Sequence, residues 1–267
     1  CKMSNKINPE IEQYIINLYQ SGFGTIEISE KYKLHRSTIQ RVLRRNNIPL
    51  RKLTPKIFYN IYFFDKFTPE SCYWAGFIAA DGYIRSDRNC VSVHLSVGDY
   101  EHLEKLAYIT GYAGNPNING DSCILSFNGK WFVKALERNF GIKPRKTFDI
   151  CIPETIPYDM LRFFIRGYFD GDGFITKSGG YIHIGITSGS NKLLEQIRNF
   201  FYDNGVVLRN DTGKPPIQES SKAINYGCAN AIKVLDLLYK DSTPATRLDR
   251  KYELYLKFKG EYKNVCN

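Results

Sequence analysis

Two aspartates occupy equivalent positions in a segment that occurs twice in the chain. Asp81 lies in the copy Tyr73–Ile84 and Asp172 lies in the copy Phe164–Ile175, so the offset is 172 − 81 = 91 residues. Each copy reads as an apolar helix with small residues on one side, then the aspartate, a glycine and an aromatic–isoleucine pair that starts a strand. The pattern predicts two equivalent helices that each end in a carboxylate.

The small residues would allow these two helices to pack closely against each other. Gly76, Gly167 and Gly171 leave room for two backbones to approach. Asp81 and Asp172 would then lie side by side at two helix C-termini, where like charge and both helix dipoles disfavour them. Divalent cations would offset this repulsion, and ligands that are all oxygen suit Mg²⁺. Metal ions between carboxylates and a phosphate activate water and stabilise a leaving oxygen.

The residues after each copy also match. Two alternating strands follow, then an amphipathic helix, a second strand pair and a closing helix. Each half therefore reads helix–strand–strand–helix–strand–strand–helix. The expected ranges are 83–88, 91–97, 103–106, 123–127 and 131–140 in the first half, and 174–178, 181–187, 193–201, 224–228 and 231–238 in the second.

The two twelve-residue segments resemble the paired LAGLIDADG motifs of single-chain homing endonucleases, and the resemblance covers about residues 60 to 260. It implies an α+β class, a duplicated αββαββα fold with pseudo-two-fold symmetry, with repeat 1 at 53–153 and repeat 2 at 154–267. It further implies a monomeric, Mg²⁺-dependent, site-specific endonuclease for double-stranded DNA. Such an enzyme cuts across the minor groove and leaves short 3′ overhangs.

The resemblance also assigns the catalytic and metal-binding residues. Asp81 and Asp172 would share two or three divalent ions, each aspartate serving one DNA strand, with the carbonyls of Ala80 and Gly171 assisting. The segments after the two closing helices resemble those where the family places an active-site lysine, so the resemblance adds Lys146 and Lys251 to the catalytic set. Asp170, at the sixth motif position where the first copy has Ala79, is expected to be a local helix-end partner instead.

The resemblance implies two curved antiparallel sheets over the DNA major groove, and outward strand positions are then the base readers. Two histidines are among them, and neither has a second His, Cys or acid at metal-ligand spacing, so we expect them to face DNA or solvent. The predicted contacts are Arg85, Ser92, His94, Ser96, Thr176, Lys177, Tyr181, His183 and Thr187 on strands, with Arg209 on a loop.

Positive charge is concentrated at the start of the chain. Residues 1–60 hold eleven Lys and Arg against four acids, which is +7 of the total +10. Three short helices are expected there, and they look like a helix-turn-helix of the resolvase type, which lays its last helix in the major groove. The predicted DNA contacts of this module, residues 1–52, are Arg36, Ser37, Thr38, Gln40, Arg41, Arg44 and Arg45, with a basic tether at Arg51 and Lys52. The alternative is a plain three-helix subdomain with a solvated basic face.

Composition and the N-terminal residues indicate the cellular compartment of the protein. No stretch approaches the ~20 apolar residues of a membrane span, the N-terminus does not resemble a signal peptide, and seven scattered cysteines favour a reducing cytosol. We expect a bacterial or phage-infected cell, with an organelle as the alternative, and a gene in a mobile intron, a prophage or a free-standing element. The rival functions are a non-cleaving DNA-binding regulator and an RNA-splicing maturase on the same scaffold.

Overall fold

A computed structural model describes residues 7–51, 58–85, 87–144 and 149–266. Three helices come first: α1 (Pro9–Gln20), α2 (Thr25–Tyr32) and α3 (Arg36–Arg45). The side chain of Asn8 caps α1 by accepting from the amide of Glu10 at 2.9 Å. The three helices enclose their own small core, and its buried residues are Ile15, Ile16, Tyr19, Ile28, Ile39, Val42 and Leu43.

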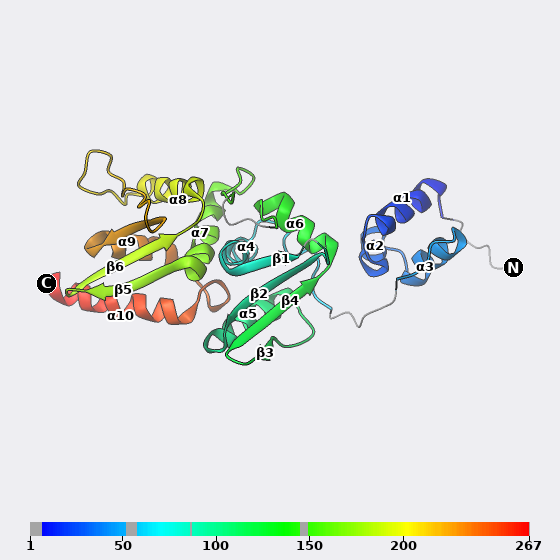
Figure 1. Cartoon of the computed structure of the whole chain (residues 1–267), viewed down its shortest axis with the longest axis horizontal. Coiled ribbons are helices and arrows are strands. Elements are labelled where there is room, and N and C mark those ends of the chain that lie inside the picture. The colour runs from blue at the N-terminus through cyan, green and yellow to red at the C-terminus, as the bar shows by residue number, and fades with distance from the viewer. Residues whose placement is uncertain (1–6, 52–57, 86, 145–148, 267) are drawn as a thin grey trace.

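The rest of the chain forms two halves whose elements follow a similar order (Figure 1). The first half contains α4 (Pro69–Asp81), β1 (Gly82–Arg85), β2 (Cys90–Ser96), α5 (Tyr100–Thr110), β3 (Asn117–Asn119), β4 (Ser122–Asn128) and α6 (Lys130–Phe140). The second contains α7 (Tyr158–Asp172), β5 (Gly173–Ser178), β6 (Tyr181–Thr187), α8 (Asn191–Asp203), β7 (Ala223–Gly227), α9 (Cys228–Tyr239) and the added α10 (Asp249–Cys266). The α+β class and the duplication are confirmed.

Each half has one antiparallel sheet, and the two sheets differ at one edge. The first has the order β1-β2-β4-β3 and the second the order β5-β6-β7. In the second half, which the structure describes from residue 149 to 266, the expected partner strand of β7 is reduced to a bridge between Gln218 and Ala223. The expectation of two full strand pairs was therefore wrong for this half. The reason is visible in the sequence, where Pro215 and Pro216 precede this bridge and cannot donate to a strand ladder.

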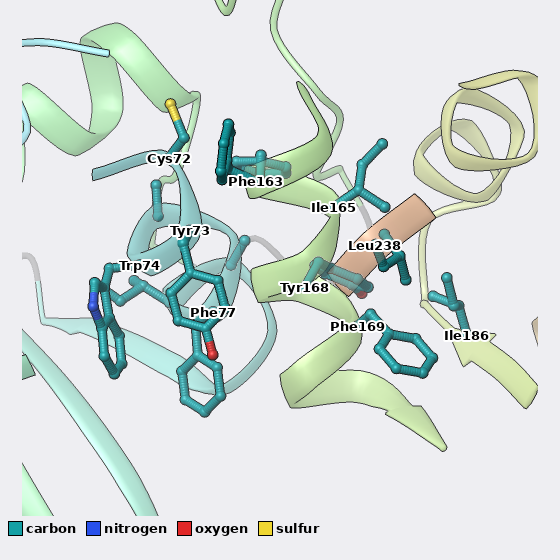
Figure 2. Packing of buried hydrophobic residues seen from close by; sticks show 14 of the residues in the cluster. Cys72, Tyr73, Trp74, Phe77, Phe163, Ile165, Tyr168, Phe169, Ile186 and Leu238 are labelled. Carbon is teal, nitrogen blue, oxygen red and sulfur yellow. The ribbon is translucent and has the colours of Figure 1, made fainter. Parts of the chain in front are cut away.

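Helices α4 and α7 lie side by side where the halves meet, and Figure 2 shows their buried aromatic side chains. Helices α5 and α6 pack on the first sheet, and α8 and α9 pack on the second. Tyr73, Trp74 and Phe77 of α4 and Phe164 and Phe169 of α7 are fully or almost fully buried. One apolar core therefore runs through both halves, which ties the position of each sheet to the crossing of α4 and α7.

Two glycines set the distance between these helices. A Cβ at Gly76 would lie 1.9 Å from the main-chain oxygen of Phe164, and a Cβ at Gly167 would lie 1.9 Å from that of Tyr73. Both pairs obey the 91-residue offset, so the contact has the symmetry of the repeat. No larger residue fits at either position while the helices keep this separation.

A buried polar chain crosses the same interface. The hydroxyl of Tyr73 on α4 donates to Asp170 on α7 at 2.8 Å and lies 3.2 Å from Nε2 of His102 on α5. Because the hydroxyl proton is directed at Asp170, the ring nitrogen is the donor in the second contact. His102 is 2% exposed and packs on Trp74 and Phe77 at ring distances of 4.6 and 4.7 Å. Burial, reinforced by Lys105, lowers the pKa of His102 to about 3.

None of the helices in the described residues combines the length and the apolar character that a bilayer crossing requires.

Replacing Gly167 by Ala tests the helix crossing. The new methyl group would meet main-chain atoms of Tyr73 and Phe77, so α4 and α7 must separate. We expect the free energy of unfolding in urea to fall by about 2–3 kcal/mol. Gly260→Ala is the control, because a Cβ there has nothing within 4 Å and should stabilise α10 by ~0.5–1 kcal/mol. A Gly167→Ala variant as stable as wild type would contradict the packing described here.

The pH dependence of stability tests His102. Its folded pKa of about 3 lies below the ordinary histidine pKa of 6.5, so the unfolded chain takes up the proton first as pH falls. The contribution of the neutral ring to the free energy of unfolding is therefore fully present above pH 6.5. It is lost progressively as the pH falls from 6.5 toward 3. Between pH 6 and 4, the urea-unfolding free energy of His102→Gln should depend less steeply on pH than that of wild type, by up to ~1.4 kcal/mol per unit. The same change at exposed His94 is the control, and parallel pH profiles for wild type and His102→Gln would refute the assignment.

Candidate active site

The C-termini of α4 and α7 bring the two predicted aspartates together. Asp81 and Asp172 are the last residues of these helices and both are half-buried. A Cβ at Gly171 would lie 2.4 Å from the Cβ of Ala80 and 3.0 Å from Oδ2 of Asp81. The carboxylate of one helix therefore lies against the last turn of the other, and the absence of a side chain at Gly171 provides the space.

A glycine follows each aspartate and lets the chain turn at once into a strand. A Cβ at Gly82 would lie 2.5 Å from the main-chain oxygen of Ile78, and a Cβ at Gly173 would lie 2.5 Å from that of Phe169. Both glycines cap their helix with extended backbone and begin β1 and β5. Each carboxylate is thus fixed at a helix–strand junction between the interface and the sheet.

Lys251 lies behind the end of α7. Its side chain is 4% exposed, and its ammonium donates to the main-chain oxygens of Phe169 and Asp170, both at 2.8 Å, of Gly173 at 2.5 Å and of Gly171 at 3.3 Å. Burial lowers the pKa of Lys251 to about 8, while Asp170, Asp81 and Asp172 oppose that shift. These contacts satisfy helix carbonyls and place positive charge at the negative end of the α7 dipole.

The ammonium of Lys251 is engaged by the main chain, whereas a catalytic lysine would direct its ammonium at a reacting water. Within the described part of the chain the hydrogen bonds of Lys251 go to main-chain oxygens, so in this arrangement it fixes the turn that carries Asp172. The other predicted lysine, Lys146, lies outside the described residues.

Asp170 is the helix-end partner that the sequence predicts. It is 1% exposed and accepts three bonds of 2.8 Å, from the hydroxyls of Tyr73 and Tyr239 and from the amide of Leu248. Burial raises its pKa, and the charge of Lys251 opposes that shift. Three donors arrive from three segments, so this carboxyl joins α4, α9 and the start of α10 to the end of α7.

Tyr168 is a site residue that sequence reasoning missed. Its hydroxyl donates to the main-chain oxygen of Thr187 at 3.2 Å, while the hydroxyl of Thr187 donates to the main-chain oxygen of Asp172 at 2.9 Å. Burial and the charge of Asp172, with a smaller effect of Asp81, raise the pKa of Tyr168. The available signal was a hydroxyl at a motif position where the first copy has Phe77.

The donor set fits a hard cation. Asp81 and Asp172 supply two carboxylates from facing helix ends, and the carbonyls of Ala80 and Gly171 precede them, so all the available donors are oxygens. Within the described residues no cluster of three or more His, Cys, Asp or Glu is placed to hold a metal. A six-coordinate Mg²⁺ here would therefore take most of its ligands from water and a phosphate.

Each sheet has an open face opposite its helices, and the register shows which side chains share it. Cross-strand partners lie on one face, so Tyr83 shares a face with Ser92, and Thr176 with His183. Of the predicted strand and loop contacts, the exposed ones are His94, Ser96, Thr176, Lys177, Tyr181 and Arg209, and Arg85, His183 and Thr187 are partly buried. Thr187 is held at the end of α7 by the bond to Asp172 described above.

Two predicted DNA contacts need correction. Ser92 is only 6% exposed, because it lies between β1 and β4 and bonds to the hydroxyl of Ser126 at 2.8 Å. Lys177 neighbours Thr176 on one strand, so the two must point to opposite faces. Lys177 pairs across the sheet with buried Ile182 and forms an ion pair with Glu261 of α10 at 2.6 Å.

The predicted DNA contacts on α3 differ in their exposure to solvent. Ser37, Arg41, Arg44 and Arg45 are exposed, whereas Arg36, Thr38 and Gln40 are partly buried. Arg45 is paired with Glu12 of α1, and Arg51 donates to the main-chain oxygen of Gly22 at 3.0 Å. Lys52 lies outside the described residues. The helix-turn-helix function of this module stays a prediction.

The chain is similar to one family model and to several solved structures. Residues 159–222 match the family model of a LAGLIDADG-like domain. Similar solved structures include the meganuclease I-SmaMI bound to uncleavable DNA (12% identity, 73% of this chain and 92% of that one, TM-score 0.43) and the LAGLIDADG homing endonuclease I-GzeII in complex with its DNA target (11%, 75% and 96%, 0.44). A third is the LAGLIDADG homing endonuclease I-LtrWI bound to target DNA (12%, 77% and 92%, 0.44). No curated protein matches the chain.

The matched segment spans most of α7, all of β5, β6 and α8, and the loop that leads to β7, and it includes Asp172. Residues 159–222 are thus similar to a LAGLIDADG-like domain, and this match leaves the rest of the chain outside it.

Proposed function

We propose that the protein is a site-specific endonuclease for double-stranded DNA that works as a monomer with divalent metal ions. The observation that carries this proposal is the meeting of Asp81 and Asp172 at the ends of two symmetric, closely packed helices. A symmetric pair of carboxylates suits a substrate with two antiparallel strands, because each half can act on one of them. The LAGLIDADG-like domain at residues 159–222 supports the same activity.

The open faces of the two sheets supply a surface for the DNA. Tyr83, Tyr181 and Thr176 are exposed there, with His94 on β2 and partly buried His183 on β6. Hydroxyl and imidazole groups can bond base edges in the major groove. Because both sheets are tied to the α4–α7 crossing, bound DNA would pass over the two aspartates, which would face the minor groove between the two sheets' contacts. Cuts on the two strands would then leave short 3′ overhangs.

The chain's own residues position and polarise the reacting groups. Divalent ions would supply charge stabilisation at the phosphate and an activated water when bound. Asp81 and Asp172 would hold those ions, and the carbonyls of Ala80 and Gly171 would assist. Lys251 fixes the last turn of α7 and hence the position of Asp172. The bonds of Tyr168 and Thr187 hold the end of β6 against the end of α7, where the same carboxylate lies.

The Asp81→Asn/Asp172→Asn double variant tests catalysis. On a plasmid that carries the native insertion site, wild type with Mg²⁺ should give linear DNA, and wild type with chelator should give none. The double variant should bind the plasmid normally and lose at least ~10³-fold of the cleavage rate, because an amide holds a divalent cation poorly.

The two single variants provide the matched comparison. If each aspartate serves one strand, Asp81→Asn and Asp172→Asn should each accumulate nicked circles rather than linear DNA. Wild type that binds the site with Mg²⁺ and never cuts it would reject the endonuclease and leave a DNA-binding regulator. Selective binding of the intron transcript instead would favour the maturase.

Deletion of residues 1–52 tests the N-terminal module as a DNA contact. The module holds most of the net positive charge, so its loss should weaken binding to duplex DNA about ten-fold or more at 100 mM salt. It should also make the slope of log affinity against log salt shallower by about 0.9 for each phosphate contact removed. The urea midpoint of the truncated chain checks that the two repeats still fold. An unchanged salt slope would show that the module does not contact DNA.

A further inference from the structure

The N-terminal module contacts repeat 1 at one end of the first sheet, where β2 begins and β4 ends. Figure 1 shows the module on the side of that end of the sheet. The ring of Phe23 meets Trp131 of α6 edge-on at 5.8 Å. The ammonium of Lys31 lies 4.8 Å from the Trp131 ring, and that of Lys130 lies 5.3 Å from the Phe23 ring. These aromatic and cation–π contacts come from both partners, so the module has a defined place against the start of α6.

A buried carboxylate lies in the seam between them. Glu27 of α2 is 3% exposed and accepts from the amide of Gly24 at 2.5 Å. Its other oxygen lies against Gly129, which caps α6, because a Cβ at Gly129 would be 2.8 Å from Oε1 of Glu27. The negative charge of Glu27 is therefore directed at the positive ends of two helices, one from each unit. It faces the seam rather than the surface.

A cavity of about 310 Å³ opens beside this seam, and cations from both units line it. Arg36 and Arg51 come from the module, and Arg88 and Lys130 come from repeat 1, with the amides of Gln40 and Asn89 between them. Glu27 is the acidic residue among the lining residues, so the charge around the cavity is strongly positive. Residues of the N-terminal module and of repeat 1 line this pocket together, although the sequence predicts them as separate units.

The guanidinium groups are held by bonds that leave donors for a ligand. Arg51 stacks on the ring of Tyr19 at 4.2 Å, and Arg36 uses Nε to bond the hydroxyl of Thr25 at 3.2 Å. A guanidinium carries five N–H donors in a planar fork that matches a phosphate. The side chain of Arg88 is 67% exposed and makes a long contact of 3.5 Å to Asp87.

We propose that this junction pocket binds a backbone phosphate of the DNA target, an inference that rests on the proposed DNA-cleaving function. The cavity has room for a phosphate and its sugar but not for a base pair. It lies between the first sheet and α3, the two surfaces expected to read bases. A phosphate held by Arg36 from one side and Arg88 from the other fixes how far apart along the DNA these surfaces read.

A double-mutant cycle on the full-length protein tests the pocket. The probe is a fluorescein-labelled 40-bp duplex of random sequence, and the variants are Arg36→Gln, Arg88→Gln and both together. Each single change should weaken binding by about 3- to 10-fold. The double variant should lose less than the product of the two losses, because both side chains serve one phosphate. Its log–log salt slope should be shallower by about 0.9.

A charge-matched control separates the pocket from general electrostatics. Lys233→Gln/Lys240→Gln removes two exposed positive charges near α9, on the side of the second sheet away from its open face. This variant should keep the wild-type salt slope, and urea midpoints within about 0.3 M of wild type should show that all variants are folded.

Three results would overturn the inference while leaving the proposed function intact. These are an unchanged salt slope for the double variant, fully independent losses in the cycle, or stabilisation by inorganic phosphate alone that disappears in the double variant while DNA binding does not change. The last would assign the pocket to a free anion. A wild-type protein that fails to bind any duplex would instead reject the proposed function itself.

Discussion

The crossing of α4 and α7 is the constraint on which the rest of the structure depends. Gly76 and Gly167 lie directly against the main-chain oxygens of Phe164 and Tyr73, so the backbones meet with no side chain between them. Because each sheet begins one residue after its helix ends, this separation sets the distance between the two sheets. It also sets the distance between the two carboxylates.

The same closeness creates an electrostatic problem at the helix ends, and the surrounding residues are arranged to meet it. Two aspartates stand at the negative ends of two dipoles. Lys251 brings a buried positive charge to the carbonyls of α7, and Asp170 is surrounded by donors from three segments. The first repeat has Ala79 at the position of Asp170, so among the described residues this buried carboxyl and its three donors are found at the end of α7 and not at the end of α4.

The N-terminal module packs against the first repeat. Its contacts with Trp131 and the position of Glu27 at the start of α6 join it to the first sheet. A cation-lined cavity at this joint connects two surfaces that otherwise differ in fold. The concentration of positive charge in the first sixty residues thus has a structural counterpart that includes Arg88 and Lys130 from the first repeat.

The amino-acid sequence by itself determined the duplication, the alternation of helices and strands, and the aspartate–glycine junctions. These depend on local periodicity and on residue size, which can be read over a few residues. The tertiary structure alone decided that Lys251 bonds to main-chain oxygens, that Tyr168 lies at the carboxylates, that Ser92 is covered, and that Lys177 faces α10. Each of these depends on partners that are distant in the chain or on the opposite face of a strand. Local patterns specify an element and its apolar face, whereas the packing of elements decides which polar groups meet, because burial makes unmatched polar groups costly.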